Sequence, residues 1–309
     1  MNLYIGSSSI GVFKLLKPIN NKVLKITGGT AKGLFTNENG KFIINNIKKI
    51  LKKQKINCVI LHFGEVDINF SYYYKLCVDN KLINYKTFCN NVYTEYIKFI
   101  DVIVKISKCK NLIIKGLYPN PVEDIYKISQ LLKYDIINDT KCIVDYKTQL
   151  NFNFQEKLRH NYNNLLKTFC NTKNKQTQNK LNVNYFYYDL DKYILNNNVM
   201  VPKYIDISHL SIHLRWEPMI QLHIKILHKF TNISTNKLIN INKLEQIYLK
   251  YKVNKLKKKG IYIKPKTHKP TTHKTKLHKT HKTKLHKTKI HKTHKPKNHK
   301  TKTIKTHKT

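Results

Sequence analysis

The chain has 309 residues, of which 40% are hydrophobic, so it is long enough to bury one sizeable core. It contains no apolar run as long as a transmembrane helix, and its first residues lack the basic flank and cleavage site of a secretory signal, which favours an intracellular, cytoplasmic protein. The formal net charge of +42 predicts an anionic partner or surface.

Three serines follow the first apolar strand. Residues 2–5 form that strand, Gly6-Ser7-Ser8-Ser9 form a small-residue turn, and an amphipathic segment begins directly after it. A strand, a turn and a helix in this order place the turn at the carboxyl edge of a parallel sheet, where α/β proteins bind their ligands. Ser8 or Ser9 would then lie at a helix N-terminus, whose free N–H groups and dipole favour developing negative charge. The same position also suits a serine that only caps the helix.

Further along the chain, short apolar runs alternate with segments of helical periodicity. The five predicted strands cover residues 2–5, 23–27, 58–63, 111–117 and 183–189. The predicted helices cover residues 42–51, 88–106, 158–169 and 219–230. Such alternation is typical of a parallel sheet with helices on both faces. With right-handed crossovers it predicts an α/β fold, a three-layer α/β/α sandwich.

Glycine-containing turns follow the second and third predicted strands. Gly28 and Gly29 would let backbone N–H groups approach a ligand or an oxyanion, although the same glycines suit a plain tight turn. After the third strand, Gly64 suits a sharp turn, and Glu65 and Asp67 would face the same edge of the sheet. These two acids could equally be a solvated pair that belongs to the turn.

A candidate relay for the serines follows the fifth strand. Asp206 and His209 are three residues apart, so the carboxylate could orient the imidazole, which would act as the base for Ser8. A capping Asp206 beside a surface His209 is the alternative. His213 shares a helix face with His209, as metal ligands do, but no further well-spaced ligand accompanies them and no metal site is expected.

The six cysteines include no C-x-x-C pair, and three of them lie in apolar segments that look like core. This pattern predicts free thiols in a reducing compartment rather than a disulfide framework.

At four places the chain resembles the SGNH, or GDSL-type, hydrolases. The matching residues are Gly6-Ser7-Ser8, the turn at Gly28 and Gly29, the run from Gly64 to Asp67, and Asp206 with His209. The resemblance covers about residues 1–230. The stretches Ile26–Leu34, Phe63–Asp67 and Phe70–Tyr74 more narrowly resemble a divergent branch found in large DNA viruses and some eukaryotes. For a viral source, the expected location is the host cell or the virion.

The resemblance implies a flavodoxin-like sheet with strand order 2-1-3-4-5 and a serine-dependent ester hydrolase that acts on acyl groups of sugars or lipids. It implies Ser8 as the nucleophile, His209 as the base and Asp206 as the residue that orients the base. Backbone N–H groups of Ser8 and of Gly28 or Gly29 would bind the oxyanion. No metal or organic cofactor is implied.

Two residues depart from the family pattern. Ser7 stands where the family has an aspartate, and Val66 stands where an asparagine side chain normally donates to the oxyanion. Losing one such donor typically lowers the rate by about 10²–10³. The acids Glu65 and Asp67 would repel an oxyanion, whereas Asn69 could replace the donor if its loop brings it round. A non-catalytic binding protein of the same fold, anchored to polyanions, is therefore the alternative to an esterase.

The C-terminal part of the chain is strongly basic. Residues 231–263 predict a basic helical extension of the hydrolase-like domain at 1–230, and residues 264–309 form a Lys-, His- and Thr-rich tail that is expected to be disordered. The tail holds 17 lysines and no acid, so it should bind nucleic acid or an acidic glycan without sequence preference. A role in solubility alone is the alternative.

Overall fold

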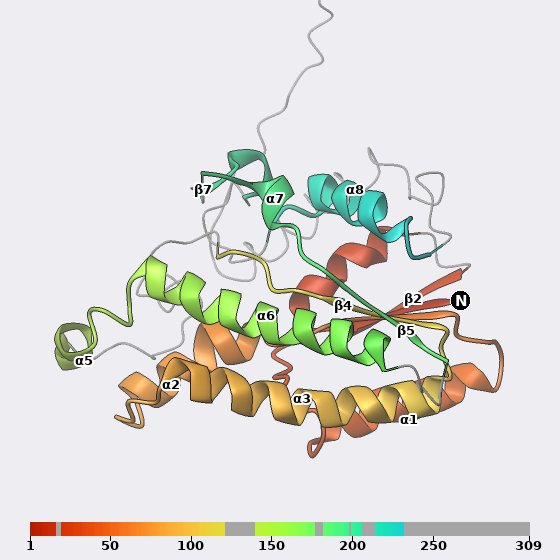
Figure 1. The fold of residues 1–309 in the computed structure, drawn as a ribbon, viewed down its shortest axis with the longest axis horizontal. Coiled ribbons are helices and arrows are strands. Elements are labelled where there is room, and N and C mark those ends of the chain that lie inside the picture. Colours follow the sequence, from red (N-terminus) through yellow and green to blue (C-terminus); the bar gives the residue numbers. More distant parts are fainter. Residues whose placement is uncertain (17–19, 121–139, 177–181, 198, 206–213, 232–309) are drawn as a thin grey trace, which may run out of the picture. The chain divides into compact units, whose positions relative to one another are not determined.

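A computed structural model shows an α/β architecture built on one five-stranded parallel sheet (Figure 1). It describes residues 1–16, 20–120, 140–176, 182–197, 199–205 and 214–231. The strands are β1 (Asn2–Gly6), β2 (Asn21–Lys25), β3 (Cys58–His62), β4 (Asn111–Lys115) and β5 (Asn184–Tyr188). They lie in the order β2-β1-β3-β4-β5, which confirms the predicted sheet and its strand order.

Helices cover both faces of the sheet, as predicted for a three-layer sandwich. One face carries the long helices α1 (Glu38–Leu51), α3 (Tyr85–Ser107) and α6 (Phe152–Lys175). The other carries the 3-10 helix η1 (Ser8–Leu15) and the helix α8 (Trp216–Leu227) (Figure 1). The first element after β1 is thus a 3-10 helix, and the serine turn lies at its start.

Successive side chains of each strand enter two different cores. Ile114 belongs to the larger core, which lies under α1, α3 and α6, and its neighbour Ile113 belongs to the smaller core, under η1 and α8. In β1, Leu3 and Ile5 face the larger core and Tyr4 the smaller one. Because both faces are buried, the strands read in the sequence as nearly continuous apolar runs.

Asparagine caps set the starts of the three long helices. Asn37 accepts a hydrogen bond from the N–H of Gly40, Asn84 from those of Lys86 and Thr87, and Asn151 from that of Phe154. These caps satisfy N–H groups that have no partner within the helix. The helices therefore begin three to six residues before the first apolar residue of each predicted range.

Several short elements were not predicted. They are the π-helix η3 (Asp67–Ser71), the helices α2 (Tyr72–Cys77), α5 (Thr140–Asp145) and α7 (Asp191–Ile194), the 3-10 helix η4 (Pro202–Tyr204), and a hairpin of β6 (Leu195–Asn196) and β7 (Val199–Met200). Each is shorter than the window over which helical periodicity becomes visible.

The prediction that all cysteines are free thiols is wrong. Cys77 at the end of α2 and Cys142 in α5 form a disulfide, with their Cα atoms 5.4 Å apart. The two residues are 65 positions apart in the sequence and are brought together only by the tertiary fold, so local spacing gave no signal. The remaining cysteines are buried and free: Cys58, Cys89, Cys109 and Cys170.

The predicted C-terminal elements lie outside the described residues, since the description ends at residue 231. None of the described helices is both long and apolar enough to span a membrane.

Candidate active site

The serine turn lies where β1 and β3 end side by side. Gly6 closes β1 so near to β3 that a Cβ atom there would lie 2.5 Å from the His62 carbonyl oxygen. The N–H of Ser7 donates to that same carbonyl at 2.9 Å, which ties the turn to the end of β3. Only glycine fits this close approach. The serines that follow Gly6 therefore lie at a fixed place on the carboxyl edge of the sheet.

The three serines of this turn are not equivalent. The hydroxyls of Ser7 and Ser9 both donate to the same oxygen of Glu65, at 3.0 and 2.5 Å, and both serines are buried. Ser8 lies between them and is partly exposed. Within the described residues its hydroxyl has no hydrogen-bond partner. The Ser8 hydroxyl is therefore available to other groups, while the hydroxyls of Ser7 and Ser9 hold the turn in place.

The turn after β2 lies beside the serine turn, because β2 pairs with β1. The N–H of Ile26 donates to the Gly6 carbonyl at 2.8 Å. Gly28 follows with a φ of +70°, in the left-handed region that favours glycine, and is exposed. The N–H of Gly29 donates to the Ile26 carbonyl at 3.3 Å, whereas that of Gly28 has no partner among the described residues. Of the two glycines predicted as oxyanion donors, Gly28 is thus the one whose N–H has no partner among the described residues.

Asp67 holds this glycine turn in place through hydrogen bonds to the backbone just after it. Its carboxylate accepts from the N–H of Ala31 at 2.6 Å and from that of Lys32 at 3.3 Å. Burial raises the pKa of Asp67 to about 6, although these two N–H groups favour the ionised form. The side chain is 2% exposed, so the interpretation of Glu65 and Asp67 as a solvated pair is wrong. Both acids are structural acceptors, one for each turn.

Both acids lie in the segment that follows β3. Gly64 has a φ of +111°, and a Cβ atom there would lie 2.4 Å from the ring of Tyr162, so the sharp turn predicted at this glycine is confirmed. Beyond it, Val66 stands just before η3, and Asn69 lies within η3, where it is partly buried. Asn69 has no hydrogen bond to any described residue, so its predicted role at the oxyanion stays a prediction.

Two basic side chains lie behind Glu65. The Nε2 atom of His62 is 2.9 Å from the second oxygen of Glu65, and the Nζ atom of Lys115, at the end of β4, is 3.3 Å from the His62 ring nitrogens. Burial and the Lys115 charge lower the pKa of His62, so a neutral ring can donate from Nε2 to Glu65 and accept from Lys115 at Nδ1. Burial also lowers the pKa of Lys115, to about 7, against the opposing effect of the Glu65 charge. Burial alone would raise the pKa of Glu65, but His62, Lys115 and the Ser9 hydroxyl hold it well below its ordinary value.

A further polar chain continues from Lys115 into the smaller core. The ammonium group of Lys115 lies 3.2 Å from the centre of the Tyr118 ring, as in a cation–π contact. Tyr118 and Tyr188 place their hydroxyls 2.6 and 2.9 Å from the two ring nitrogens of His223. Burial lowers the pKa of His223 well below its ordinary value, so one ring nitrogen of the neutral imidazole donates and the other accepts.

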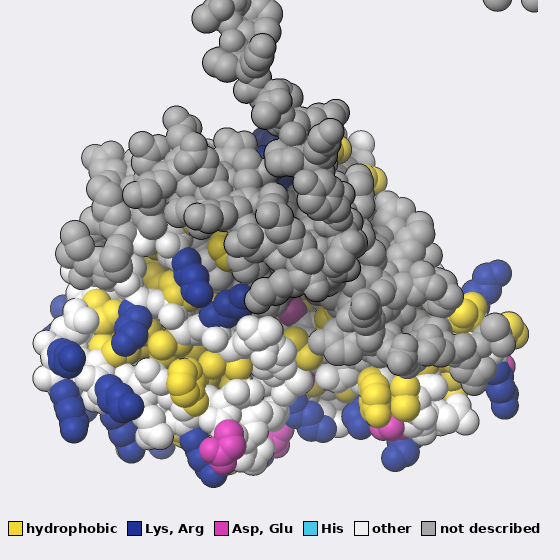
Figure 2. Space-filling model, turned by 180° about the vertical axis from the view of Figure 1, so that it is seen from behind, with side chains coloured by type: hydrophobic (Ala, Val, Ile, Leu, Met, Phe, Trp, Pro, Cys, Tyr) yellow, Lys and Arg dark blue, Asp and Glu magenta, His cyan; other side chains and the backbone are white. Residues whose placement is uncertain are grey.

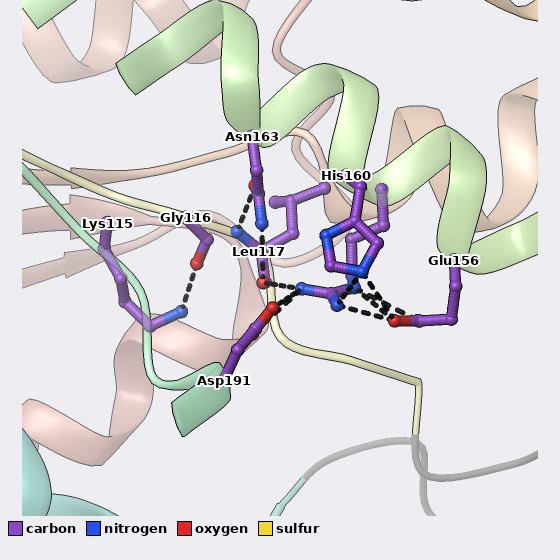
Figure 3. A network of polar contacts seen from close by, with 8 residues as sticks. Lys115, Gly116, Leu117, Glu156, His160, Asn163 and Asp191 are labelled. Carbon is purple, nitrogen blue, oxygen red and sulfur yellow. Dashed lines mark hydrogen bonds and ion pairs between the residues drawn. The ribbon is translucent and has the colours of Figure 1, made fainter. Parts of the chain in front are cut away.

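Arg159 on α6 holds the chain that follows β4. Its guanidinium binds Glu156, Asp191 and the carbonyl of Leu117, and it is 2% exposed. Asn163, one turn further along α6, accepts from the Leu117 N–H at 2.8 Å and donates to its carbonyl at 3.2 Å (Figure 3). These contacts fix the backbone between Lys115 and Tyr118, and so the placement of both side chains.

The predicted relay residues Asp206 and His209, and with them His213, lie outside the described residues. The residues on either side of this segment are described. Ile205 and Leu214 pair as an antiparallel β-bridge, and the N–H of Arg215 donates to the Tyr204 carbonyl at 2.8 Å. A small cavity next to the serine turn is lined by Ser9, Val12, Tyr118, Leu214, Trp216 and Met219. Of the two described residues that flank this segment, Leu214 therefore lies beside the serine turn, and Ile205 is paired with it.

The sequence prediction missed four residues of this site in their present roles. Glu65 was recognised only as a residue that faces this edge, and His62, Lys115 and His223 were not recognised as polar partners at all. A lysine that ends an apolar run at residue 115 was the one available signal, because lysine is rarely buried without a partner. His223 carried no signal, because one histidine on the apolar face of a helix resembles many others.

No protein-family profile and no curated protein sequence matches this chain. Among solved structures, the chain is similar to a protein from Streptococcus pneumonia that is provisionally described as a platelet activating factor. The two share 12% sequence identity with a TM-score of 0.43, over 74% of this chain and 82% of that chain. This likeness is too distant to carry an argument about activity.

Proposed function

We propose that this chain is a serine-dependent ester hydrolase of the SGNH type, with Ser8 as its nucleophile. One observation carries the proposal: of three consecutive serines at the carboxyl edge of the sheet, two donate to Glu65 and only Ser8 has a hydroxyl that is free of described partners. A nucleophilic serine needs such a hydroxyl, open to both a substrate and a base.

Two backbone donors lie near this serine. Ser8 is the first residue of η1 and Gly28 follows the neighbouring strand, and neither N–H has a partner among the described residues. N–H groups that are fixed in place can stabilise the negative charge of a tetrahedral intermediate, and a helix N-terminus adds its dipole to that effect. In this proposal the backbone supplies the oxyanion hole, and Val66 contributes nothing to it.

The base of the proposed reaction is His209, oriented by Asp206. Their segment begins after Ile205 and ends before Leu214, and Leu214 lines the same cavity as Ser9. The proposal requires the His209 imidazole to lie within hydrogen-bond distance of the Ser8 hydroxyl. His209 would take the Ser8 proton as the hydroxyl attacks the ester carbonyl, and would then return it to the leaving alcohol.

The substrate class of the proposal is an ester of a sugar or a lipid, and no cofactor takes part. A fluorophosphonate probe tests the proposal, because it forms a covalent bond with an activated serine. Wild-type protein should be labelled at Ser8, and Ser8→Ala and His209→Ala should lose the labelling. Ser107→Ala, at the far end of α3, is the matched control and should be labelled like the wild type.

Hydrolysis of p-nitrophenyl acetate should follow the same pattern across these four proteins. If the wild type reacts with the probe no faster than Ser8→Ala, the esterase proposal is wrong. The chain would then be better described as a non-catalytic binding protein of the same fold.

A second proposal concerns the partner of the basic tail. We infer that residues 264–309 hold the protein on a polyanion, either a nucleic acid or an acidic glycan. The tail accounts for 17 of the 42 net positive charges, and Figure 2 shows lysines and arginines spread over the described part of one face, with few acidic side chains. Positive charge on both parts would let the described residues add to the binding.

Salt dependence tests this second proposal on the full-length chain. Binding to double-stranded DNA should fall by about 10³-fold or more between 50 and 200 mM salt if at least six phosphates are neutralised, and binding to heparin should also weaken as salt rises. Replacing the 17 tail lysines with glutamine should abolish most of this binding and leave Ser8 labelling unchanged. If binding survives the replacement, the described residues are responsible for it, and the role proposed for the tail is wrong.

A further inference from the structure

One carboxylate oxygen holds both neighbours of the proposed nucleophile. The hydroxyls of Ser7 and Ser9 donate to the same oxygen of Glu65, at 3.0 and 2.5 Å, although Glu65 lies 56 or more residues away in the sequence. Hydrogen bonds to a charged acceptor are stronger than neutral ones. Two of them, placed on either side of Ser8, limit the rotation of the whole turn.

The charge on Glu65 is maintained from behind. Its other oxygen lies 2.9 Å from Nε2 of His62, which is fully buried, and Lys115 supports that ring from the next strand. The side chain of Glu65 itself is 14% exposed. A carboxylate that is mostly removed from water stays ionised only where donors and positive charge surround it, as they do here.

Lys115 is itself held on several sides. Its ammonium group donates to the Gly116 carbonyl at 2.8 Å, and Asn163 binds the Leu117 backbone that follows (Figure 3). The same ammonium group lies over the Tyr118 ring, and Arg159 donates to the Leu117 carbonyl. The hydrogen bonds therefore run from Lys115 through His62 and Glu65 to the serine turn, and the backbone between Lys115 and Leu117 connects them to α6. A shift of Glu65 would have to disturb these contacts.

We propose that Glu65 is a positioning residue that locks Ser7 and Ser9 and thereby fixes the orientation of Ser8 for attack. The role in attack rests on the proposed esterase function, while the locking of the turn can be tested without it. Glu65 is not the base of the reaction, because it binds the hydroxyls that flank Ser8. Its acidity is also too strong for a base near neutral pH.

Truncating the two flanking hydroxyls tests the proposal without altering any charge. In Ser7→Ala/Ser9→Ala, the rate constant for fluorophosphonate bond formation at Ser8 should fall roughly 10- to 100-fold, the size expected for lost hydrogen bonds to a charged group. Probe affinity should change little, because positioning acts on the bond-forming step. Ser9→Thr keeps a hydroxyl and should recover most of the rate that Ser9→Ala loses. Glu38→Gln, which removes a carboxylate from a surface ion pair with Lys41, should match the wild type.

A mutant cycle identifies Glu65 as the residue through which the two serines act. Adding Glu65→Gln to the double-alanine variant should slow bond formation much less than Glu65→Gln does alone, because the bonds it would disturb are already gone. Independent, multiplicative effects would overturn the proposal. Lys115→Met in the Glu65→Gln background is the second variant if Glu65→Gln alone does not fold, because it removes the buried ammonium that has lost the neighbouring negative charge.

Amide hydrogen exchange of peptides that cover residues 6–10 supplies the readout that needs no activity. Exchange there should be faster in Ser7→Ala/Ser9→Ala than in the wild type, at least tenfold, and unchanged in Glu38→Gln. If the probe does not label the wild type but exchange rises as expected, the esterase function fails and the locking of the turn stands. If neither the exchange nor the labelling differs between the double variant and the wild type, Glu65 does not position this turn.

Discussion

The two faces of the sheet bury different kinds of groups. On the face covered by α1, α3 and α6, the larger core is formed by aliphatic, aromatic and cysteine side chains from the strands, the long helices and the segments that connect them. On the face covered by η1 and α8, the smaller core surrounds a buried histidine, and a buried lysine ends the neighbouring strand β4. There His223 lies between Tyr118 and Tyr188, and Tyr4 stacks on Phe13 with ring centres 4.3 Å apart.

This difference separates a part of the fold that is stabilised mainly by apolar burial from the part that lies beside the candidate site. Apolar burial needs only area and shape, so the larger core can tolerate changes that keep both. A buried polar group needs a partner for each donor and acceptor, so the chain Glu65–His62–Lys115 permits few alternatives. Such a chain is costly to bury, and it lies at the sheet edge that carries the serine turn.

The sharpest test of this division uses two neighbouring residues of β4. Ile113 and Ile114 are both fully buried but face opposite cores, so replacing either with alanine should lower the free energy of unfolding by about 2–5 kcal/mol. Only Ile113→Ala should also slow probe labelling at Ser8, because Ile113 packs in the same cluster as Ile10 and Phe13 of η1. Urea unfolding and labelling kinetics measure the two effects.

Conditions where both variants remain folded are needed for that comparison. Equal slowing of labelling by Ile113→Ala and Ile114→Ala would mean that the two faces do not divide the roles, and that any loss of core packing loosens the site.

The larger core was also the part of the fold that the sequence predicted best. Residues 43, 47 and 50 repeat at helical spacing in α1, and the five apolar runs correspond to the five strands within a few residues. Periodicity works there because one stripe of each long helix meets an apolar sheet. The ends of those helices were less accurate, since they depend on Asn37, Asn84 and Asn151, which are polar and lie outside the apolar pattern.

The candidate site was predicted only in part, for a physical reason. The turns at Ser7–Ser9, Gly28 and Gly64 follow from local chemistry and were found. The contact between Ser7 and Glu65 joins the segments that follow the neighbouring strands β1 and β3. Nothing in the sequence of either segment indicates that the two side chains meet. The resembled family has an aspartate where this chain has Ser7, and here a carboxylate reaches that serine from Glu65 instead. Asp206 and His209 stay predictions, as they lie outside the described residues.

The next largest expected effect on the free energy of unfolding comes from removing the disulfide, whose residue Cys77 packs against the larger core. Replacing Cys77 and Cys142 with serine should lower the free energy of unfolding by about 2–4 kcal/mol, because the bond closes a loop of 65 residues in the unfolded chain. Urea unfolding with and without a reducing agent measures this. Cys170→Ser, at a buried free thiol, keeps the disulfide and is the control whose stability should respond to the reducing agent, whereas the stability of the double-serine variant should not. An identical response from both proteins would contradict the pairing of Cys77 with Cys142.

Asp67 joins two segments of the candidate site, because its carboxylate reaches from the segment after β3 to the glycine turn after β2. Asp67→Ala should cost about 1.5–3 kcal/mol of stability, since it leaves the buried N–H of Ala31 and the partly buried N–H of Lys32 without their acceptor. Asp67→Asn keeps one acceptor oxygen and should recover part of that loss. Hydrogen exchange at residues 28–32 should increase more in the alanine variant than in the asparagine variant. Equal exchange in both would mean that the glycine turn does not depend on this carboxylate.

The smallest predicted effect is a pH dependence that belongs to the smaller core. Burial, with Lys115 and His62 nearby, lowers the pKa of His223 in the folded protein below the value of about 6.5 in the unfolded chain. Below about pH 6.5 the unfolded chain therefore binds a proton that the folded protein does not, and stability falls as the pH falls, by up to about 1.4 kcal/mol per pH unit. His223→Gln, which can still bond both Tyr118 and Tyr188, should lose less stability than the wild type between pH 6.5 and 5.5. His62 is present in both proteins, so its own titration cancels in this comparison. Parallel plots of the free energy of unfolding against pH for the wild type and His223→Gln would contradict this prediction. They would show that the pKa of His223 is not lowered by folding, and that water reaches its ring in the smaller core.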